Sequence, residues 1–241
     1  RKVCGRGSYY IAVEVKGEKM PYSIAIDGPA GAGKSTIAKA LAKSLGYYYV
    51  DTGALYRGLA FGLLQKGVPF QNEKAVEEEI KGIHVELLYE NGVQKVLCNG
   101  VDCSAFIRTS EIGEGASVIS QYASVREKLL DLQRNVARQH SCVMDGRDIG
   151  SVVLPDANKK FFLTASPEVR ARRRTLEFQQ KGESANYESV LEEVKKRDER
   201  DMSRAVAPLK QVEDAILIDS SDLNIEEVVD KMLAYCVGSE A

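Results

Sequence analysis

Short apolar runs alternate with longer amphipathic stretches along most of this 241-residue chain. The first apolar run, residues 22–26, precedes a stretch whose apolar residues recur at helical spacing as far as Gly46, a natural helix stop. Further runs predict strands at residues 47–51, 142–145, 160–164 and 215–219. Amphipathic stretches predict helices over 54–66, over 110–140, from 167 onward, over 187–203 and over 225–235. These repeated strand–helix units predict an α/β fold, in which helices cover both faces of a parallel sheet.

The pattern changes between residues 73 and 109. Residues 73–81 are acidic and predict a short helix, and two β-rich segments follow at 83–89 and 93–97. Glu-Asn-Gly at 90–92 is typical of a hairpin turn, and Asn-Gly at 99–100 indicates a second tight turn. We therefore expect a small β-rich insertion in an otherwise alternating chain.

Residues 1–19 begin with a basic, glycine-rich stretch and stand apart from the alternating pattern. Met20 immediately precedes the first apolar strand, so we expect it to be the functional start and the preceding residues to be an extension of the core. The apolar residues at 9–13 could still pair as an edge strand. We expect a single domain over residues 20–237.

Composition narrows the partners of the chain. Hydrophobic residues make up 44% and charged residues 28%, and the net charge of −2 gives no basic field for nucleic acid. No apolar run approaches the roughly 20 residues that a membrane-spanning helix needs. Five irregularly spaced cysteines favour a reducing cytoplasm over a disulfide framework, and only two histidines are present, which argues against a histidine-based triad. We expect a cytoplasmic monomer without nucleic-acid or membrane partners.

Residues 28–36 hold a complete G-x-x-x-x-G-K-[ST] phosphate loop between the first strand and the first helix. Its glycines let the backbone curl so that N–H groups point at an anion, which also faces the positive N-terminus of the helix. Lys34 is expected to reach the outer phosphates of a nucleotide, and the Ser35 hydroxyl to bind Mg²⁺ directly. A glycine-rich turn without a ligand is the alternative. The predicted phosphate-binding residues are Gly28, Pro29, Ala30, Gly31, Ala32, Gly33, Lys34, Ser35 and Thr36.

Charged residues also follow two other predicted strands, at the ends where ligands bind in this architecture. Asp-Thr-Gly-Ala-Leu-Tyr-Arg at 51–57 puts Arg57 one helical turn beyond the second strand. Asp-Gly-Arg-Asp at 145–148 follows the strand that we expect beside the first. Asp145 is well placed to bind Mg²⁺ through water, and Arg147 and Asp148 are expected to face the cleft. The alternatives are a capped helix with an exposed arginine and a plain turn.

A third charged cluster occupies two predicted helices. Four arginines within five residues repel one another unless an anion screens them, and the later members share one helical stripe. A solvated helix face is the alternative. The polar segment at 179–184 predicts a mobile tip, so we expect an arginine-bearing lid over about 170–190 that closes over a phosphoryl group and excludes water. The cluster consists of Arg170, Arg172, Arg173, Arg174, Arg197, Arg200, Asp201 and Arg204.

Six segments together resemble bacterial cytidylate kinases, of the nucleoside monophosphate kinase group. They are IDGPAGAGKST at 26–36, DTGALYR at 51–57, IRT at 107–109, DGRDIG at 145–150, RARRR at 170–174 and RDERDMSRAVAPL at 197–209. Many kinases share the first segment, whereas the combination of the fourth and the last is highly specific. The resemblance covers residues 20–237. It implies a P-loop nucleoside monophosphate kinase fold with a five-stranded parallel sheet, the β-rich insertion and the lid.

The resemblance also implies a reaction: transfer of the γ-phosphoryl group of ATP to CMP or dCMP, with Mg²⁺, in pyrimidine nucleotide metabolism. By the same resemblance Asp148 belongs near the sugar, Arg57 and Arg147 near the acceptor phosphate, and Arg197 with Asp201 near cytosine or sugar. The catalytic set that it implies is Lys34, Arg147, Asp148 and the lid arginines Arg170, Arg173 and Arg174. The substrate-binding set is Thr52, Arg57, Ser117, Arg126, Asp148, Arg197, Asp201 and Arg204.

Two other functions stay open on the residues alone. A kinase for another small acceptor, such as shikimate, UMP or AMP, shares the loop and the lid. A nucleotide-binding switch would bind nucleotide without releasing ADP. The sequence lacks the catalytic and activation loops of protein kinases and the Asn-Lys-x-Asp motif of GTPases, so transfer to a small acceptor is favoured over a switch.

Overall fold

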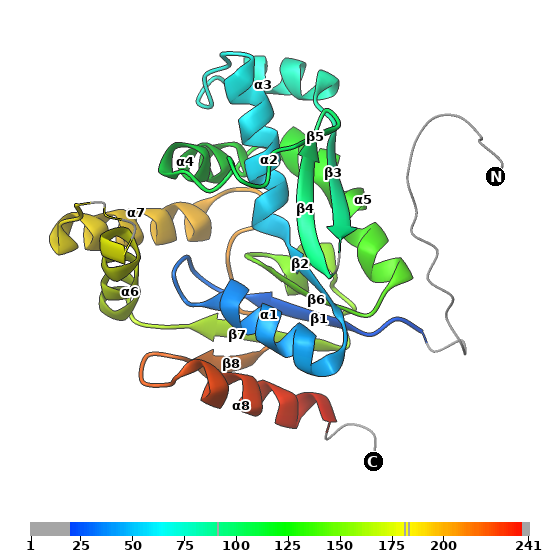
Figure 1. Cartoon of the computed structure of the whole chain (residues 1–241), viewed down its shortest axis with the longest axis vertical. Helices are drawn as coiled ribbons and strands as arrows, with labels where there is room; N and C mark the ends of the chain where they lie inside the picture. The colour runs from blue at the N-terminus through cyan, green and yellow to red at the C-terminus, as the bar shows by residue number, and fades with distance from the viewer. Residues whose placement is uncertain (1–19, 91, 181, 183, 238–241) are drawn as a thin grey trace.

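The computed structural model describes residues 20–90, 92–180, 182 and 184–237, and a parallel five-stranded sheet forms its centre (Figure 1). The strand order β2-β6-β1-β7-β8 confirms the predicted sheet. The strands are β1 Ser23–Asp27, β2 Tyr48–Asp51, β6 Cys142–Gly146, β7 Lys159–Thr164 and β8 Ile216–Asp219. The predicted extension at 1–19, with its possible edge strand, lies outside the described residues.

Helices cover both faces of this sheet because its central strand is apolar on both sides. In β1, Ile24 and Ile26 pack with residues of α1 (Lys34–Leu45) and α8 (Ile225–Val237). Ala25, between them, points to the other face and belongs to the cluster that includes residues of α5 (Ala123–Gln139). The carboxyl ends of β1, β2 and β6 therefore meet at one edge, where the phosphate loop begins.

A second, antiparallel sheet forms the predicted insertion. Its strands are β3 Val85–Glu90, β4 Val93–Cys98 and β5 Val101–Asp102, and α2 (Thr52–Gln65), α3 (Glu73–Glu79) and α4 (Ser110–Ile119) lie around it (Figure 1). Gln94 of β4 joins the two sheets: its Oε1 accepts from the backbone N–H of Asp51 at 2.8 Å, and its Nε2 donates to the carbonyl oxygen of Asp51 at 3.1 Å. The insertion thus fixes the end of β2.

Two helices form the arm in which the lid is predicted. α6 (Pro167–Gln180) and α7 (Tyr187–Ser203) pack through the buried side chains of Ala171, Val190 and Val194, at one side of the molecule in Figure 1. Residues 181 and 183 of the predicted tip lie outside the described residues.

The predicted helical stretch over 110–140 consists of two helices, because α4 ends at Ile119 and α5 begins at Ala123. Side chains satisfy the backbone at the break. Ser120 Oγ donates to the carbonyl oxygen of Ser117 at 2.9 Å, and Arg126 Nη1 donates to the carbonyl oxygen of Ser120 at 3.1 Å. The helical periodicity of the sequence does not mark the break that these contacts stabilise.

A π-helical turn, η2 (Ile149–Val153), follows β6 and is absent from the sequence expectation. Its first N–H groups are held by the carboxylate of Asp27, which accepts from Ile149 N and Gly150 N at 2.7 Å each. Burial raises the pKa of Asp27 from 3.8 to about 6, although these two donors lower it. Asp27, immediately before the phosphate loop, therefore fixes the segment that follows Asp148.

Asp27 is expected to favour the folded state at mildly acid pH. Because its folded pKa of about 6 exceeds the ordinary value of 3.8, its stabilising contribution is complete below pH 3.8 and is lost as the pH rises through about 6. The free energy of unfolding of the native protein minus that of Asp27→Asn, measured in urea, should fall by about 1 kcal/mol between about pH 5 and about pH 7.5. A constant or rising difference would contradict this.

Within the described part of the chain, Cys98, Cys103 and Cys142 form no disulfide bond. No helix there is both long and apolar enough to cross a membrane.

Candidate active site

The phosphate loop has the shape that its glycines predict. Gly28 has a φ of 147°, and a Cβ on it would lie 1.9 Å from the carbonyl oxygen of Leu163, so only glycine fits. Gly33, at a φ of 86°, takes the left-handed conformation directly before α1. The loop therefore turns into the N-terminus of α1, where backbone N–H groups and the helix dipole favour an anion.

Lys34 is the buried cation of this loop. Lys34 is only 5% exposed, and its Nζ donates to the carbonyl oxygen of Pro29 at 2.7 Å. Burial and the neighbouring Arg147 lower the pKa of Lys34 well below its ordinary value, while Asp145, Asp201 and Asp27 oppose that shift. An anionic phosphate at this position would stabilise the charged ammonium.

Ser35 and Asp145 come together from α1 and β6. Ser35 Oγ donates to Asp145 Oδ2 at 3.0 Å, and Tyr49 OH donates to Asp145 Oδ1 at 2.9 Å. A hydroxyl and a carboxylate are the oxygen ligands that Mg²⁺ prefers. Among the residues that the structure describes, no group of three or more His, Cys, Asp or Glu could hold a metal ion. The Ser35–Asp145 pair fits Mg²⁺ that takes its other ligands from phosphates and water.

One cavity of about 790 Å³ runs from the phosphate loop to α4 and α7. Its walls come from the loop and the start of α1, the start of α2, α4, Arg126 of α5, the end of β6 with the two residues after it, α6, α7 and the start of α8. The predicted site residues that line it are Ala30, Gly31, Ala32, Gly33, Lys34, Ser35, Thr36, Thr52, Arg57, Ser117, Arg126, Asp145, Arg147, Asp148, Arg173, Arg174, Arg197, Asp201 and Arg204. The structure thus brings nearly all of the predicted site into one space.

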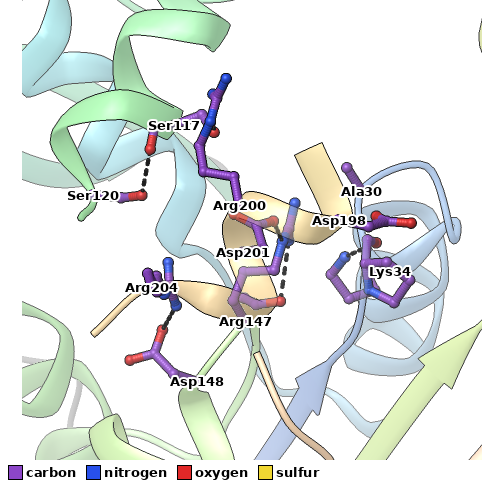
Figure 2. Close-up of polar contacts among 12 residues, drawn as sticks. Ala30, Lys34, Ser117, Ser120, Arg147, Asp148, Asp198, Arg200, Asp201 and Arg204 are labelled. Carbon is purple, nitrogen blue, oxygen red and sulfur yellow. Dashed lines mark hydrogen bonds and ion pairs between the residues drawn. The ribbon is translucent and has the colours of Figure 1, made fainter. Parts of the chain in front are cut away.

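Buried ion pairs hold several of the arginines that line this cavity. Asp148 pairs with Arg126 through Oδ2 and with Arg204 through Oδ1, the latter at 3.3 Å. Arg147 Nε donates to Asp201 Oδ2 at 2.8 Å. Figure 2 shows the Arg147–Asp201 pair between Lys34 and the pair of Asp148 with Arg204. Two carboxylates therefore hold three guanidinium groups in fixed positions.

Asp51 organises the remaining wall. Its Oδ1 accepts from Ala54 N at 2.9 Å, and its Oδ2 pairs with Arg57 at 2.8 Å and with Arg108 at 3.4 Å. Thr52 Oγ1 donates to the carbonyl oxygen of Asp145 at 2.7 Å, which ties the end of β2 to the end of β6. Arg57 and Arg108 both line the cavity. Arg108 belongs to the insertion, so the insertion contributes a cation to the cavity.

Three lining arginines have buried donors without a partner among the described residues. The Nε–H groups of Arg57, Arg174 and Arg197 make no hydrogen bond within the described part of the chain. Burial and Arg147 lower the pKa of Arg197 to about 10, and Arg174 contributes to that shift. Unsatisfied buried donors and mutually repelling guanidinium groups together fit an anionic ligand.

The cytidylate kinase family pattern matches residues 24–237. The cytidylate kinase of Desulfitobacterium hafniense is 49% identical over 219 residues, which is 90% of this chain and 93% of that protein. The chain belongs to the cytidylate kinase family. The cytidylate kinase of Caldicellulosiruptor bescii is 47% identical over 211 residues, which is 88% of this chain and 93% of that protein. The crystal structure of an uncharacterised protein from Eubacterium ventriosum has a TM-score of 0.50 at 14% identity and covers 91% of this chain and 99% of that one.

In this cytidylate kinase family member, three predicted site residues lie outside the cavity lining. Gly28 and Pro29 shape the base of the loop. Arg170 is buried: its Nη1 and Nη2 bind Asp198 Oδ1 and Oδ2 at 2.9 and 2.6 Å, and Nη1 also donates to the carbonyl oxygen of Ala30 at 3.1 Å. This placement favours a structural role for Arg170 over the catalytic role expected from the sequence.

Sequence reasoning gave no role to four residues that build the site. Asp27 and Asp51 each end a buried strand, a position that could have marked both carboxylates. Arg108 belongs to the IRT segment, which was recognised without a role for its arginine. The guanidinium group of Arg126 lies over the ring of Tyr56, 5.7 Å from the ring centroid. The last contact joins two helices and has no signal in the sequence.

Proposed function

We propose that this protein transfers the γ-phosphoryl group of ATP to CMP or dCMP, giving ADP and CDP or dCDP. The observation that carries the proposal is the single cavity with a phosphate loop at one end and paired arginines and carboxylates at the other. The names of the relatives, cytidylate kinase, support the acceptor. The three unpartnered Nε–H groups support an anionic ligand between the two ends.

ATP binds with its β- and γ-phosphates in the phosphate loop, where Lys34 and the N-terminus of α1 carry positive charge. Ser35 would hold Mg²⁺ directly and Asp145 would hold it through water, and the ion would neutralise charge on the phosphates. Tyr49 keeps Asp145 turned toward Ser35 through its hydrogen bond. Arg173 lies on the ATP side of the lid. Its Nη2 donates to the carbonyl oxygen of Ser220 at 2.6 Å.

CMP occupies the opposite end. Arg57, Arg108 and Arg147 bind its phosphate, since all three line the cavity and can make charge-assisted hydrogen bonds. The group that holds cytosine and sugar is Thr52, Ser117, Arg126, Asp148, Arg197, Asp201 and Arg204. The ion pairs of Asp148 with Arg126 and Arg204 thereby serve recognition of the nucleoside.

The chemical step needs no strong general base. The attacking oxygen of the CMP phosphate is already anionic, so catalysis rests on alignment and on neutralising charge around the γ-phosphorus. Lys34, Arg147 and the lid arginines Arg173 and Arg174 supply that charge. Closing of the arm formed by α6 and α7 excludes water from the transfer. We expect the enzyme to act as a cytoplasmic monomer.

An ADP-release assay with a panel of acceptors tests the proposal. CMP and dCMP should release ADP well, and UMP, AMP and shikimate poorly. Equal or greater release with one of the latter three would identify a kinase for another acceptor. Nucleotide binding without ADP release from any acceptor would identify a switch instead.

Arg57→Ala is expected to raise the KM for CMP by about 10- to 100-fold, because one charge-assisted contact to the phosphate is lost. Steady-state kinetics with saturating ATP measure this, and Arg138→Ala, at an exposed position on α5, is the control. An unchanged KM for CMP would remove Arg57 from the acceptor site.

A further inference from the structure

Arg200 of α7 reaches across to α4 on the acceptor wall. Its Nη1 donates to Ser117 Oγ at 3.0 Å and lies 2.7 Å from Glu114 Oε1. Figure 2 shows the Arg200 side chain extending from the arm toward Ser117, on the opposite side of the Arg147–Asp201 pair from Lys34. One guanidinium group therefore connects the lid arm to a residue that we assign to the substrate.

The hydrogen bond restricts what the Ser117 hydroxyl can do. A guanidinium group only donates, so Ser117 Oγ must act as the acceptor in this contact. The backbone carbonyl of Ser117 is already taken by Ser120 Oγ at 2.9 Å. Ser117 is only 5% exposed and lines the cavity. Its hydroxyl hydrogen is thus left for a partner other than Arg200.

We propose that Arg200 is a positioning residue, which acts on the acceptor nucleotide by fixing the position and the hydrogen-bond direction of the Ser117 hydroxyl. This inference rests on the proposed function, because it assigns Ser117 to the CMP side. Arg200 itself does not touch the substrate. Arg200 contacts Glu114 and Ser117 of α4, whereas Asp201 is held by Arg147 and Arg204 is held by Asp148.

Glu114 sets the direction of the Arg200 side chain. The carboxylate is 56% exposed whereas the Arg200 side chain is 21% exposed, so the ion pair lies at the rim and the hydrogen bond to Ser117 lies inside it. An exposed pair contributes little to stability. The main consequence of the contact is therefore expected at Ser117 and in substrate binding.

A double-mutant cycle on the full chain tests the inference. Arg200→Ala should raise the KM for CMP by about 10-fold, as loss of one hydrogen bond to a charged group predicts, with kcat and the KM for ATP changed less than about twofold. In a Ser117→Ala background, the same substitution should change the KM for CMP by less than about twofold, since the residue through which it acts is gone. Arg200→Lys keeps a donor and a cation and should recover part of the loss.

The controls separate positioning from tethering. Glu114→Gln should shift the KM for CMP in the same direction but less than Arg200→Ala. Lys196→Ala, an exposed cation on the same helix, should leave all parameters unchanged. Circular dichroism checks folding, and Arg200→Lys serves in the cycle if Arg200→Ala does not fold.

Two results would overturn the inference. Equal effects of the Arg200 substitution with and without Ser117 would mean that the arginine only ties α7 to α4. A loss confined to kcat would also exclude positioning of the acceptor. If the native enzyme neither binds CMP in calorimetry nor releases ADP with it, the proposed function fails as well, which distinguishes the two failures.

Discussion

Lys34→Ala is expected to lower kcat by about 10³-fold or more, the magnitude typical of a buried group that stabilises charge in a transition state. Lys34 lies at the start of α1, in a space shared with Asp145, Asp201 and Arg147. Its ammonium is buried, so little water screens its interaction with a migrating phosphoryl group. In Lys34→Ala a neutral methyl group replaces the charged side chain. The phosphoryl group then lacks its nearest cation during transfer.

Single-turnover kinetics with saturating ATP and CMP measure this loss directly. Lys43→Ala, at an exposed position on the same helix, is the matched control and should retain normal turnover. Near-normal turnover by Lys34→Ala would refute the assignment of residues 28–36 as the ATP site.

Asp198→Ala is expected to lower the free energy of unfolding by about 3–5 kcal/mol, because it leaves a buried guanidinium without its carboxylate. The Arg170 side chain is 3% exposed and forms two parallel bonds to Asp198. Arg170 also donates to the carbonyl oxygen of Ala165 at 2.8 Å and to that of Ala30 in the phosphate loop. Loss of Asp198 should therefore loosen α6, α7 and the loop together.

Urea unfolding at neutral pH, followed by circular dichroism, measures the change. Glu199→Ala, at the exposed neighbouring position on α7, should change stability by less than about 0.5 kcal/mol. A loss at Asp198 no larger than that at Glu199 would show that the pair does not hold the arm to the loop.

Local sequence patterns sufficed for the strands of the main sheet and for the shape of the phosphate loop. Each buried strand is a short apolar run, and the phosphate loop is a contiguous motif whose backbone shape follows from its glycines. The carboxyl ends of parallel strands meet at one edge of a sheet, so the sequence alone predicts that Asp145 and Arg147 lie near the loop.

Contacts between distant segments could not be predicted in the same way. Arg170 carries the same charge as Arg173 and Arg174, and the sequence does not reveal that Asp198, 28 positions later, takes it out of the cavity. The break between α4 and α5 is likewise stabilised by side chains whose partners are set by tertiary packing. Charge pattern predicts that an anion site exists, whereas packing decides which arginine faces it.

A crystal structure with a non-hydrolysable ATP analogue and CMP tests the central claim most directly. The account predicts both nucleotides end to end in the one cavity, with Lys34 at the outer phosphates of the analogue and Arg57 and Arg147 within about 3 Å of the CMP phosphate oxygens. Guanidinium groups that point into bulk solvent, away from both ligands, would contradict it.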